Sequence, residues 1–193
     1  IALASPDDLG RVDCVSSAFH HGHPSAVEQA LRLRARARGE DVEAQLPAYE
    51  SSWTQALCWR ERRLGVTRNT VAASTFHSAF VDTQGQLLTC GKPARDDPEE
   101  DLPPGLLGHG EALRALRRPR AIASLSSVRV YGVAAGSYHT LVLTESGAVF
   151  SFGSGALGKL GHGDEADALL PRRIDALRAV RALSVAAGPA HSV

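Results

Sequence analysis

A glycine-rich segment is the first part of this sequence whose residue types and spacing could do chemistry. Residues Gly153 to Gly158 match G-x-G-x-x-G, and Lys159 follows directly, much as in a phosphate-binding loop. Both kinds of loop bind phosphate through the free amide groups at the start of a helix. Gly161 and Gly163 follow closely and would break such a helix. The sequence therefore favours a structural turn here over a nucleotide site.

Histidines are the second group that could do chemistry, and five of the eight fall into two repeated sets. The first set is His77, His139 and His191, and the second is His109 and His162. A catalytic histidine is needed once, beside a particular acid or base, whereas a histidine in every copy of a repeat favours bonding to buried backbone groups between strands. His20, His21 and His23 have no flanking Cys or acidic residue to complete a metal site, so a solvated linker is favoured. We therefore predict no catalytic residue, no metal site and no cofactor, and we class the chain as non-enzymatic.

Charge and cysteine content argue against several other classes of function. The chain has 193 residues with 21 Lys and Arg against 21 Asp and Glu, so its formal net charge is zero. This balance gives no electrostatic footprint for DNA or anionic lipid, and we expect neither nucleic acid nor a membrane as partner. The three cysteines form no Cys-x-x-Cys pair, which argues against a disulfide framework and favours a cytoplasmic or nuclear protein. The chain contains no methionine, and we expect it to be a fragment of a longer protein.

An internal repeat organises the chain from residue 71 onward. Val71, Val133 and Val185 each begin a Val-Ala-Ala segment that leads to His-Ser or His-Thr, at spacings of 62 and 52 residues. The structural landmarks that align between copies are His77, His139, His191, Gly85, Gly91, Gly108, Gly110, Gly136, Gly147, Gly153, Gly161, Gly163 and Gly188. The stretch from Gly91 to Gly108 is nine residues longer than its counterpart, and it holds the acidic run Asp96–Asp101. That run is either a tolerated surface loop or a contact for a basic partner.

Each copy of the repeat predicts a group of short strands. The stretches 140–144 and 149–152 are rich in β-branched and aromatic residues and flank a Ser-Gly turn, and 79–82 with 86–89 repeat this hairpin. Strands and turns at a period of about 50 residues are typical of propeller blades with about four strands. We therefore predict a mainly β repeat region, about two blades of an incomplete β-propeller, preceded by a small α-helical region.

The residues before the repeat are predicted to form helices. A first helical segment runs from Ser5 to Phe19, and capping boxes at 25–28 and 52–55 begin two more, which end at Gly39 and Gly65. The predicted domains are a helical segment at 1–23, a two-helix linker region at 24–69, and the repeats at 71–193, with two copies and the start of a third.

The second copy resembles the regulator of chromosome condensation repeat family. The matching elements are Val133-Ala-Ala-Gly-x-x-His139, Gly147-x-Val149, Phe152-Gly153, Gly158-Lys-Leu-Gly-His-Gly163 and Pro171. The first copy departs from the family pattern at Ser74, where the family has glycine. Family members usually form a seven-bladed β-propeller that presents loops to other proteins. The resemblance therefore implies a protein–protein interaction scaffold.

A second resemblance lies near the N-terminus. Leu9, Val12, Val15 and Phe19 recur at roughly helical spacing, and the segment from Ser5 to Phe19 resembles the second half of an F-box. F-boxes are short helical modules that dock onto the adaptor of a cullin-based ubiquitin ligase. The resemblance implies that these four residues contact the adaptor while the propeller selects the substrate. A generic amphipathic helical hairpin is the alternative interpretation.

The repeat resemblance leaves other functions open. Some family members exchange guanine nucleotide on a small GTPase, and the founding member binds chromatin, against which the zero net charge argues. The repeats also resemble those of the plant ultraviolet-B receptor, which absorbs light through clustered tryptophans on its propeller. Trp53 and Trp59 both precede the repeats, so we predict no ultraviolet-B response. From their helical spacing, we expect Trp53 in a helical core and Trp59 partly exposed.

Overall fold

The computed structural model describes residues 26–39, 52–63, 66, 68–91, 105–110, 113 and 115–193. The chain divides into two compact units, Ile1–Val66 and Thr67–Val193. The proposed adaptor contacts Leu9, Val12, Val15 and Phe19, the cluster His20, His21 and His23, and the acidic run Asp96–Asp101 lie outside the described residues.

The first unit contains two described helices, α2 (Ala26–Ala37) and α3 (Trp53–Arg63). Helix α3 begins as its capping box predicts, because the Gln55 amide donates to Ser52 Oγ at 3.2 Å. Helix α2 ends in a turn at Gly39, whose φ of 74° suits glycine and whose amide donates to the Arg36 carbonyl at 2.9 Å. The predicted start of α3 and the predicted stop of α2 at Gly39 are therefore confirmed, while Ser25 and Gly65 lie outside the described residues.

The prediction that Trp59 is partly exposed is wrong. Trp59 is only 6% exposed, and the four consecutive residues from Ala56 to Trp59 are all buried. Four consecutive buried residues cover more than one face of a helix, so α3 is not a one-sided amphipathic helix, as the spacing argument assumed. The Arg63 guanidinium also lies 5.7 Å from the centre of the Trp59 ring. The side chain of Trp53 lies outside the described residues.

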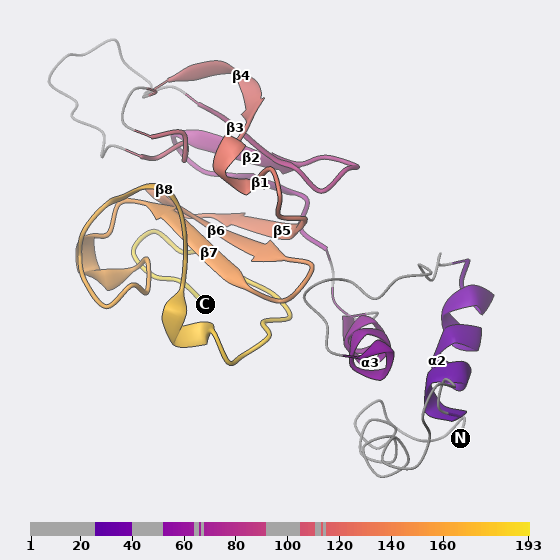
Figure 1. Cartoon of the computed structure of the whole chain (residues 1–193). Helices are drawn as coiled ribbons and strands as arrows, with labels where there is room; N and C mark the ends of the chain where they lie inside the picture. The colour runs from indigo at the N-terminus through magenta and orange to yellow at the C-terminus, as the bar shows by residue number, and fades with distance from the viewer. Residues whose placement is uncertain are drawn as a thin grey trace, which may run out of the picture. The chain divides into compact units, whose positions relative to one another are not determined.

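The second unit contains two four-stranded antiparallel sheets, as the repeat predicts (Figure 1). The first blade, in strand order, consists of β1 (Val71–Ala73), β2 (His77–Val81), β3 (Leu87–Gly91) and β4 (Leu116–Ala121). The second blade consists of β5 (Val130–Ala135), β6 (His139–Thr144), β7 (Val149–Gly153) and β8 (Ala168–Arg173). Short 3₁₀ turns follow β4, β7 and β8, at η2 (Ala123–Leu125), η3 (Ala156–Gly158) and η4 (Asp175–Leu177). The predicted fold class, a mainly β region of two propeller blades preceded by helices, is confirmed.

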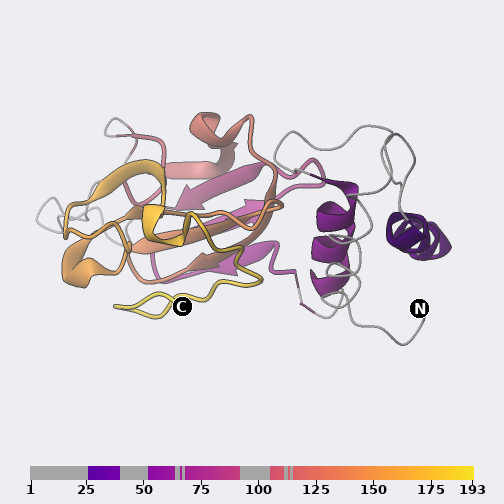
Figure 2. The same ribbon diagram turned by 60° about the horizontal axis from the view of Figure 1, so that its bottom comes forward.

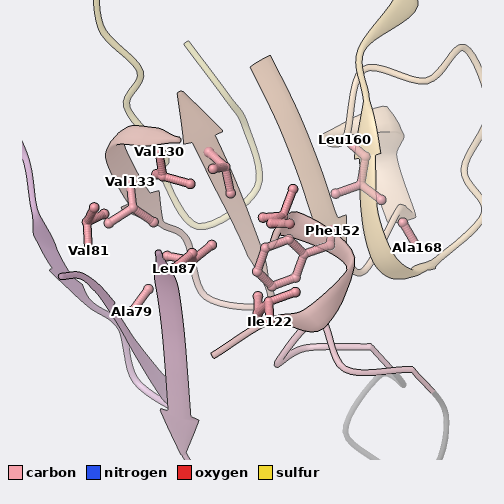
Figure 3. Packing of buried hydrophobic residues seen from close by; sticks show 11 residues of the cluster. Ala79, Val81, Leu87, Ile122, Val130, Val133, Phe152, Leu160 and Ala168 are labelled. Atoms are coloured by element: carbon pink, nitrogen blue, oxygen red, sulfur yellow. The ribbon is translucent and has the colours of Figure 1, made fainter. Parts of the chain in front are cut away.

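The two blades pack against each other, with β5 lying against β1 and β2 (Figures 1 and 2). Their shared core is shown in Figure 3 and consists of Ala79, Val81, Leu87, Ile122, Leu125, Val130, Val133, Val142, Phe152, Leu160 and Ala168. Phe152 is fully buried at its centre, with its ring directed toward Ile122 (Figure 3). Because both blades contribute to one hydrophobic cluster, each stabilises the other.

Backbone hydrogen bonds between successive copies repeat with the sequence. The Val130 amide donates to the Gly85 carbonyl at 2.8 Å, and the Ala182 amide donates to the Gly147 carbonyl at 2.9 Å. These glycines form the tight turns β2–β3 and β6–β7, where φ values of 79° and 83° require glycine. The turns therefore both reverse the chain and bind the next copy.

The start of the third copy has the same local structure as the first two. The amides of Ser74, Gly136 and Gly188 each donate to the carbonyl of the histidine three residues later, at 2.9 Å in every case. The sequence alignment of the three copies therefore describes equivalent positions in space.

Candidate interaction surface

The antiparallel order of each blade places its long connections at one end. We call this the loop end, and it comprises residues 74–76, 105–110, 136–138 and 154–167 of the two blades. The tight turns at 82–86 and 145–148 lie at the opposite end, which we call the turn end. Loops supported by a rigid sheet are where propellers carry their binding residues, so the loop end is the candidate interaction surface.

A histidine at the loop end links the first blade to the second. Ser74 Oγ lies 2.8 Å from His77 Nδ1, and His77 Nε2 lies 2.7 Å from Thr140 Oγ1 on β6. Burial, and then the neighbouring His139, lowers the pKa of His77 to about 4. The ring is therefore neutral near pH 7, where Nε2–H can donate to Thr140 while Nδ1 accepts from Ser74.

The equivalent histidine of the second blade links it to the third copy. His139 Nε2 lies 3.0 Å from Ser192 Oγ, and Ser192 Oγ donates to the Lys159 carbonyl at 2.7 Å. Because the serine proton is used in that second bond, Nε2–H of His139 must be the donor in the first. Burial, and then Lys159, lowers the pKa of His139 to about 4. His77 and His139 thus each link their own blade to the next copy, at the same repeat position.

The Nδ1 atoms of His77 and His139 have different surroundings in the two blades. His139 Nδ1 is buried and has no hydrogen-bond partner among the described residues. Gly136 lies directly beside it, and a Cβ on Gly136 would be 2.6 Å from that nitrogen. The first blade has Ser74 at this position, where its hydroxyl bonds to the ring. The departure from the family pattern at Ser74 therefore supplies a hydrogen bond that the second blade lacks.

His109 and His162, which we call the outer histidines, have the same arrangement of contacts in their two blades. Thr89 Oγ1 on β3 donates to the Leu107 carbonyl at 2.7 Å and lies 3.0 Å from His109 Nε2. In the second blade Ser151, Leu160 and His162 repeat these contacts at 2.7 and 3.0 Å.

The surroundings of these two outer histidines are also repeated. Partial burial is the main cause that lowers the pKa of His109 and of His162, and Arg120 or Arg172 on the outer strand adds to it. Each of these four histidines therefore lies within hydrogen-bond distance of a hydroxyl group. Backbone hydrogen bonds at His191 and Ser151 also partly offset the lowering of the pKa of His139 and of His162.

Several landmark glycines lie where another chain segment passes at close range. A Cβ on Gly91 would be 2.4 Å from the Phe76 carbonyl, and one on Gly153 would be 2.4 Å from the Tyr138 carbonyl. Gly108 packs on the Phe152 ring, and Gly188 lies against the ring of His191. Gly110 donates from its amide to the Leu169 carbonyl at 3.0 Å, whereas its counterpart Gly163 has open space around it. Gly161 contacts the Ile174 side chain.

The segment that resembles a phosphate-binding loop leads into no helix. After β7 comes the single 3₁₀ turn η3, in which Leu157 has a φ of 63°. Lys159 follows and donates from Nζ to Ser154 Oγ and to the Ala156 carbonyl, both at 3.0 Å. The segment is the turn that the sequence analysis favoured, and its lysine bonds within the loop.

Two apolar features of the loop end were not found from the sequence. Phe76 and Tyr138 stack with ring centres 5.1 Å apart, and both are half-buried. Leu157 is 74% exposed at the tip of the β7–β8 connection. The sequence could have indicated this stack, because Phe76 directly precedes His77 and Tyr138 directly precedes His139, at the same repeat position. We call His77 and His139 the inner histidines.

Metal and membrane sites were also sought among the described residues. No group of three His, Cys, Asp or Glu side chains there could hold a metal ion. None of the helices described is long and apolar enough to cross a bilayer.

Comparison with known proteins identifies the repeat. Residues 146–193 match the profile of the regulator of chromosome condensation (RCC1) repeat, and residues 130–159 match a second profile of the same repeat. The chain is 30% identical over 163 residues, 84% of its length, to E3 ubiquitin-protein ligase HERC2 of Homo sapiens, of which it covers 3%. It is 37% identical over 107 residues to protein RCC2 of Homo sapiens, with 54% of this chain and 19% of that protein covered. The chain thus spans only a small part of these relatives.

Solved structures support the same fold. The structure of Prp20p from Saccharomyces cerevisiae, described together with its binding to Gsp1p and histones, aligns at a TM-score of 0.50 and 26% identity over 67% of this chain and 31% of that one. Human WBSCR16 aligns at a TM-score of 0.53 and 23% identity over 65% of this chain and 30% of that one, which shows the fold alone. The second unit therefore has the fold of two propeller blades, and residues 130–193 within it match the RCC1 repeat.

Proposed function

We propose that this chain, whose second unit is built from RCC1-type repeats, is a non-enzymatic scaffold that binds a protein partner at the loop end of its blades. The observation that carries the proposal is the Phe76–Tyr138 stack, which lies half-buried on two connections of the loop end, with the exposed Leu157 on a third connection of the same end. Loops held by a rigid sheet are where binding residues concentrate.

We further propose that this scaffold is the substrate-recognition part of an F-box ubiquitin-ligase adaptor. The similarity to the ubiquitin-protein ligase HERC2 extends over 84% of the chain and supports a role in ubiquitin ligation. The residues that would contact the ligase adaptor are Leu9, Val12, Val15 and Phe19. In this arrangement the helical segment docks by its apolar side chains and the blades hold the substrate.

The test of the adaptor role is a pull-down of the purified ligase adaptor with the chain. We expect retention of the adaptor, and we expect Val12→Asp to abolish it. Leu33→Asp is the matched control, because Leu33 is a leucine of α2 that is 65% exposed and should tolerate a charge. Failure of the unsubstituted chain to retain the adaptor, or equal loss with both variants, would overturn the F-box assignment.

Guanine-nucleotide exchange on a small GTPase is the second candidate. The similarity to Prp20p, whose binding to Gsp1p is described, favours it. A nucleotide-release assay with fluorescent GDP on small GTPases separates the two candidates. Accelerated release that Leu157→Ser removes, together with no adaptor binding, would establish exchange in place of ligase recruitment.

A further inference from the structure

Strand β4, at the outer edge of the first blade, carries a basic strip that we define as Arg117, Arg118 and Arg120 (Figure 1). All three arginines are exposed, and none of them forms an ion pair with another described residue. Guanidinium groups so close together repel one another and attract anionic groups. Within the part of the chain that the structure describes, the basic strip is therefore accessible and uncompensated.

The corresponding strand of the second blade does not carry this charge. The strand registers align β4 with β8 at an offset of 52 residues. Arg117 and Arg118 stand where β8 has Leu169 and Leu170, and only the third arginine of the basic strip has an arginine as its counterpart. The blade can therefore be built with leucines at the first two positions, so these two arginines are not required by the strand itself.

The second blade shows what docks on this part of an outer strand. The 105–110 connection of the first blade passes along β8, and the Gly110 amide donates to the Leu169 carbonyl at 3.0 Å. A Cβ on Gly105 would lie 2.6 Å from Leu169 Cα, and one on Gly110 would lie 4.0 Å from Leu170 Cδ2. The outer strand thus holds a polypeptide segment through one backbone carbonyl and through the side chains beside it.

Strand β4 offers the same attachment with different side chains. The Arg117 carbonyl corresponds to the Leu169 carbonyl, and no described residue outside its own sheet donates to it. An apolar segment laid against Arg117 and Arg118 would remove two charges from water without pairing them, whereas carboxylates would pair with them. A peptide backbone can also donate to the free carbonyl, while the phosphates of a nucleic acid can only accept. The strand is therefore suited to an acidic polypeptide.

We propose that β4 is a docking strand for an acidic segment of a partner protein, whose carboxylates pair with the basic strip and whose backbone donates an amide to the Arg117 carbonyl. None of the basic strip belongs to the loop end, so this inference goes beyond the proposed function and does not depend on it. Charges on an edge strand can also serve only to prevent pairing with other strands, and that alternative predicts no preference for acidic peptides.

Fluorescence anisotropy with labelled probes tests the docking strand in the whole chain. The probes are an oligoglutamate peptide, an oligoglutamine peptide of the same length, and duplex DNA with the same number of charges. We expect the glutamate peptide to bind more tightly than both other probes, and more weakly as the salt concentration rises. Equal binding of the glutamine peptide, tighter binding of the DNA, or no binding of the glutamate peptide would overturn the proposal.

Paired substitutions locate the binding on β4. Arg117→Gln with Arg118→Gln should weaken the glutamate peptide about fivefold or more, since two exposed ion pairs are lost. Arg173→Gln with Arg178→Gln removes the same charge outside β4, and this control should change the affinity by less than about twofold. Arg117→Leu with Arg118→Leu copies β8, so it preserves the strand and should weaken the peptide as the glutamine pair does. Equal loss in the control, or no loss in either β4 pair, would refute the assignment.

His109 provides a local readout of the same event. Burial is the main cause that lowers its pKa, and Arg120 adds to it. A carboxylate that pairs with Arg120 should therefore raise the pKa of His109 toward its ordinary value, which NMR titration of ¹³C-labelled histidine measures. His162, beside Arg172, is the internal control and should not change. An equal change at both rings, or none at His109 with the peptide bound, would contradict docking on the basic strip.

The outcomes also separate this inference from the proposed function. If Leu157→Ser removes binding of the glutamate peptide while Arg117→Gln with Arg118→Gln does not, acidic segments bind at the loop end, and the docking strand is wrong. If the arginine pair alone weakens the peptide, and neither Leu157→Ser nor Phe76→Ser reduces capture of a protein partner, the docking strand is supported and the loop end is not the interaction surface.

Discussion

The hydrogen bond between His77 and Thr140 offers a direct test of how the blades hold together. Thr140 is fully buried on β6, and its hydroxyl lies 2.7 Å from His77 Nε2 of the preceding blade. Thr140→Val keeps the side-chain shape but leaves the buried Nε2 of His77 without its hydrogen-bond partner, which costs about 1–3 kcal/mol. That is a large share of the stability of a small domain, about 5–15 kcal/mol. We therefore expect a clearly lower free energy of unfolding.

The matched control is Ser78→Ala. Ser78 holds the same repeat position in the first blade, is only half-buried, and bonds to no histidine within the described residues. Its removal should change the free energy of unfolding by no more than about 0.5 kcal/mol. Both variants are measured by urea unfolding followed by circular dichroism, because Trp53 and Trp59 precede the blades and their fluorescence reports the first unit.

A double-mutant cycle isolates the bond itself. His77→Leu and Thr140→Val remove the two partners separately, and the coupling energy should be about 0.5–3 kcal/mol if the bond links the blades. Strict additivity, or a loss for Thr140→Val no larger than for Ser78→Ala, would refute the reasoning.

Three further predictions follow from the same contacts. Folding lowers the pKa of His77 and His139 from about 6.5 to about 4, so between these pH values the unfolded chain binds more protons than the folded one. The urea midpoint should therefore be constant above pH 7 and fall as the pH drops from about 6.5 to 4. In His77→Leu the midpoint should fall less steeply with pH. Phe152→Ala should cost about 3–5 kcal/mol in calorimetric or urea unfolding, since the ring is fully buried between the blades. Gly153→Ala should strongly lower the thermal midpoint of unfolding, because the added Cβ would lie 2.4 Å from the Tyr138 carbonyl. Gly163→Ala should lower it less, because nothing lies within 4 Å of a Cβ at that position.

The strands, and which strand of one blade corresponds to which strand of the other, could be predicted because the same residues recur in each copy of the repeat. Each turn glycine and each inner histidine recurs with its neighbours, so aligning the copies predicted the hairpins around Gly85 and Gly147. The same alignment identifies the sheet end at which each landmark lies, since strand order within a blade is antiparallel. Local pattern was sufficient here because the structure is itself periodic.

The hydrogen-bond partners could not be predicted in the same way. His77 bonds to Thr140, 63 residues later, and the sequence marks both positions without indicating that they meet. The prediction for Trp59 was wrong for a related reason. Helical spacing gives the direction of a side chain around the helix, but not how many sides of that helix are covered by other parts of the chain. Both errors concern packing between elements, which depends on distant segments and not on local periodicity.

The inner histidine position shows how a repeat tolerates departure from its own pattern. In the second blade a glycine must stand beside the ring, since a Cβ on Gly136 would also lie 2.6 Å from the Gly188 carbonyl of the third copy. In the first blade Ser74 occupies this place and its hydroxyl bonds to Nδ1 of His77. Glycine there leaves Nδ1 of His139 without a partner among the described residues, whereas the Ser74 hydroxyl gives Nδ1 of His77 one. The two residues are therefore alternatives at one position, and the serine adds hydrogen bonds with Nδ1, the carbonyl and the amide of His77. The Nε2 bond to the next copy, which the blades share, is the same in both.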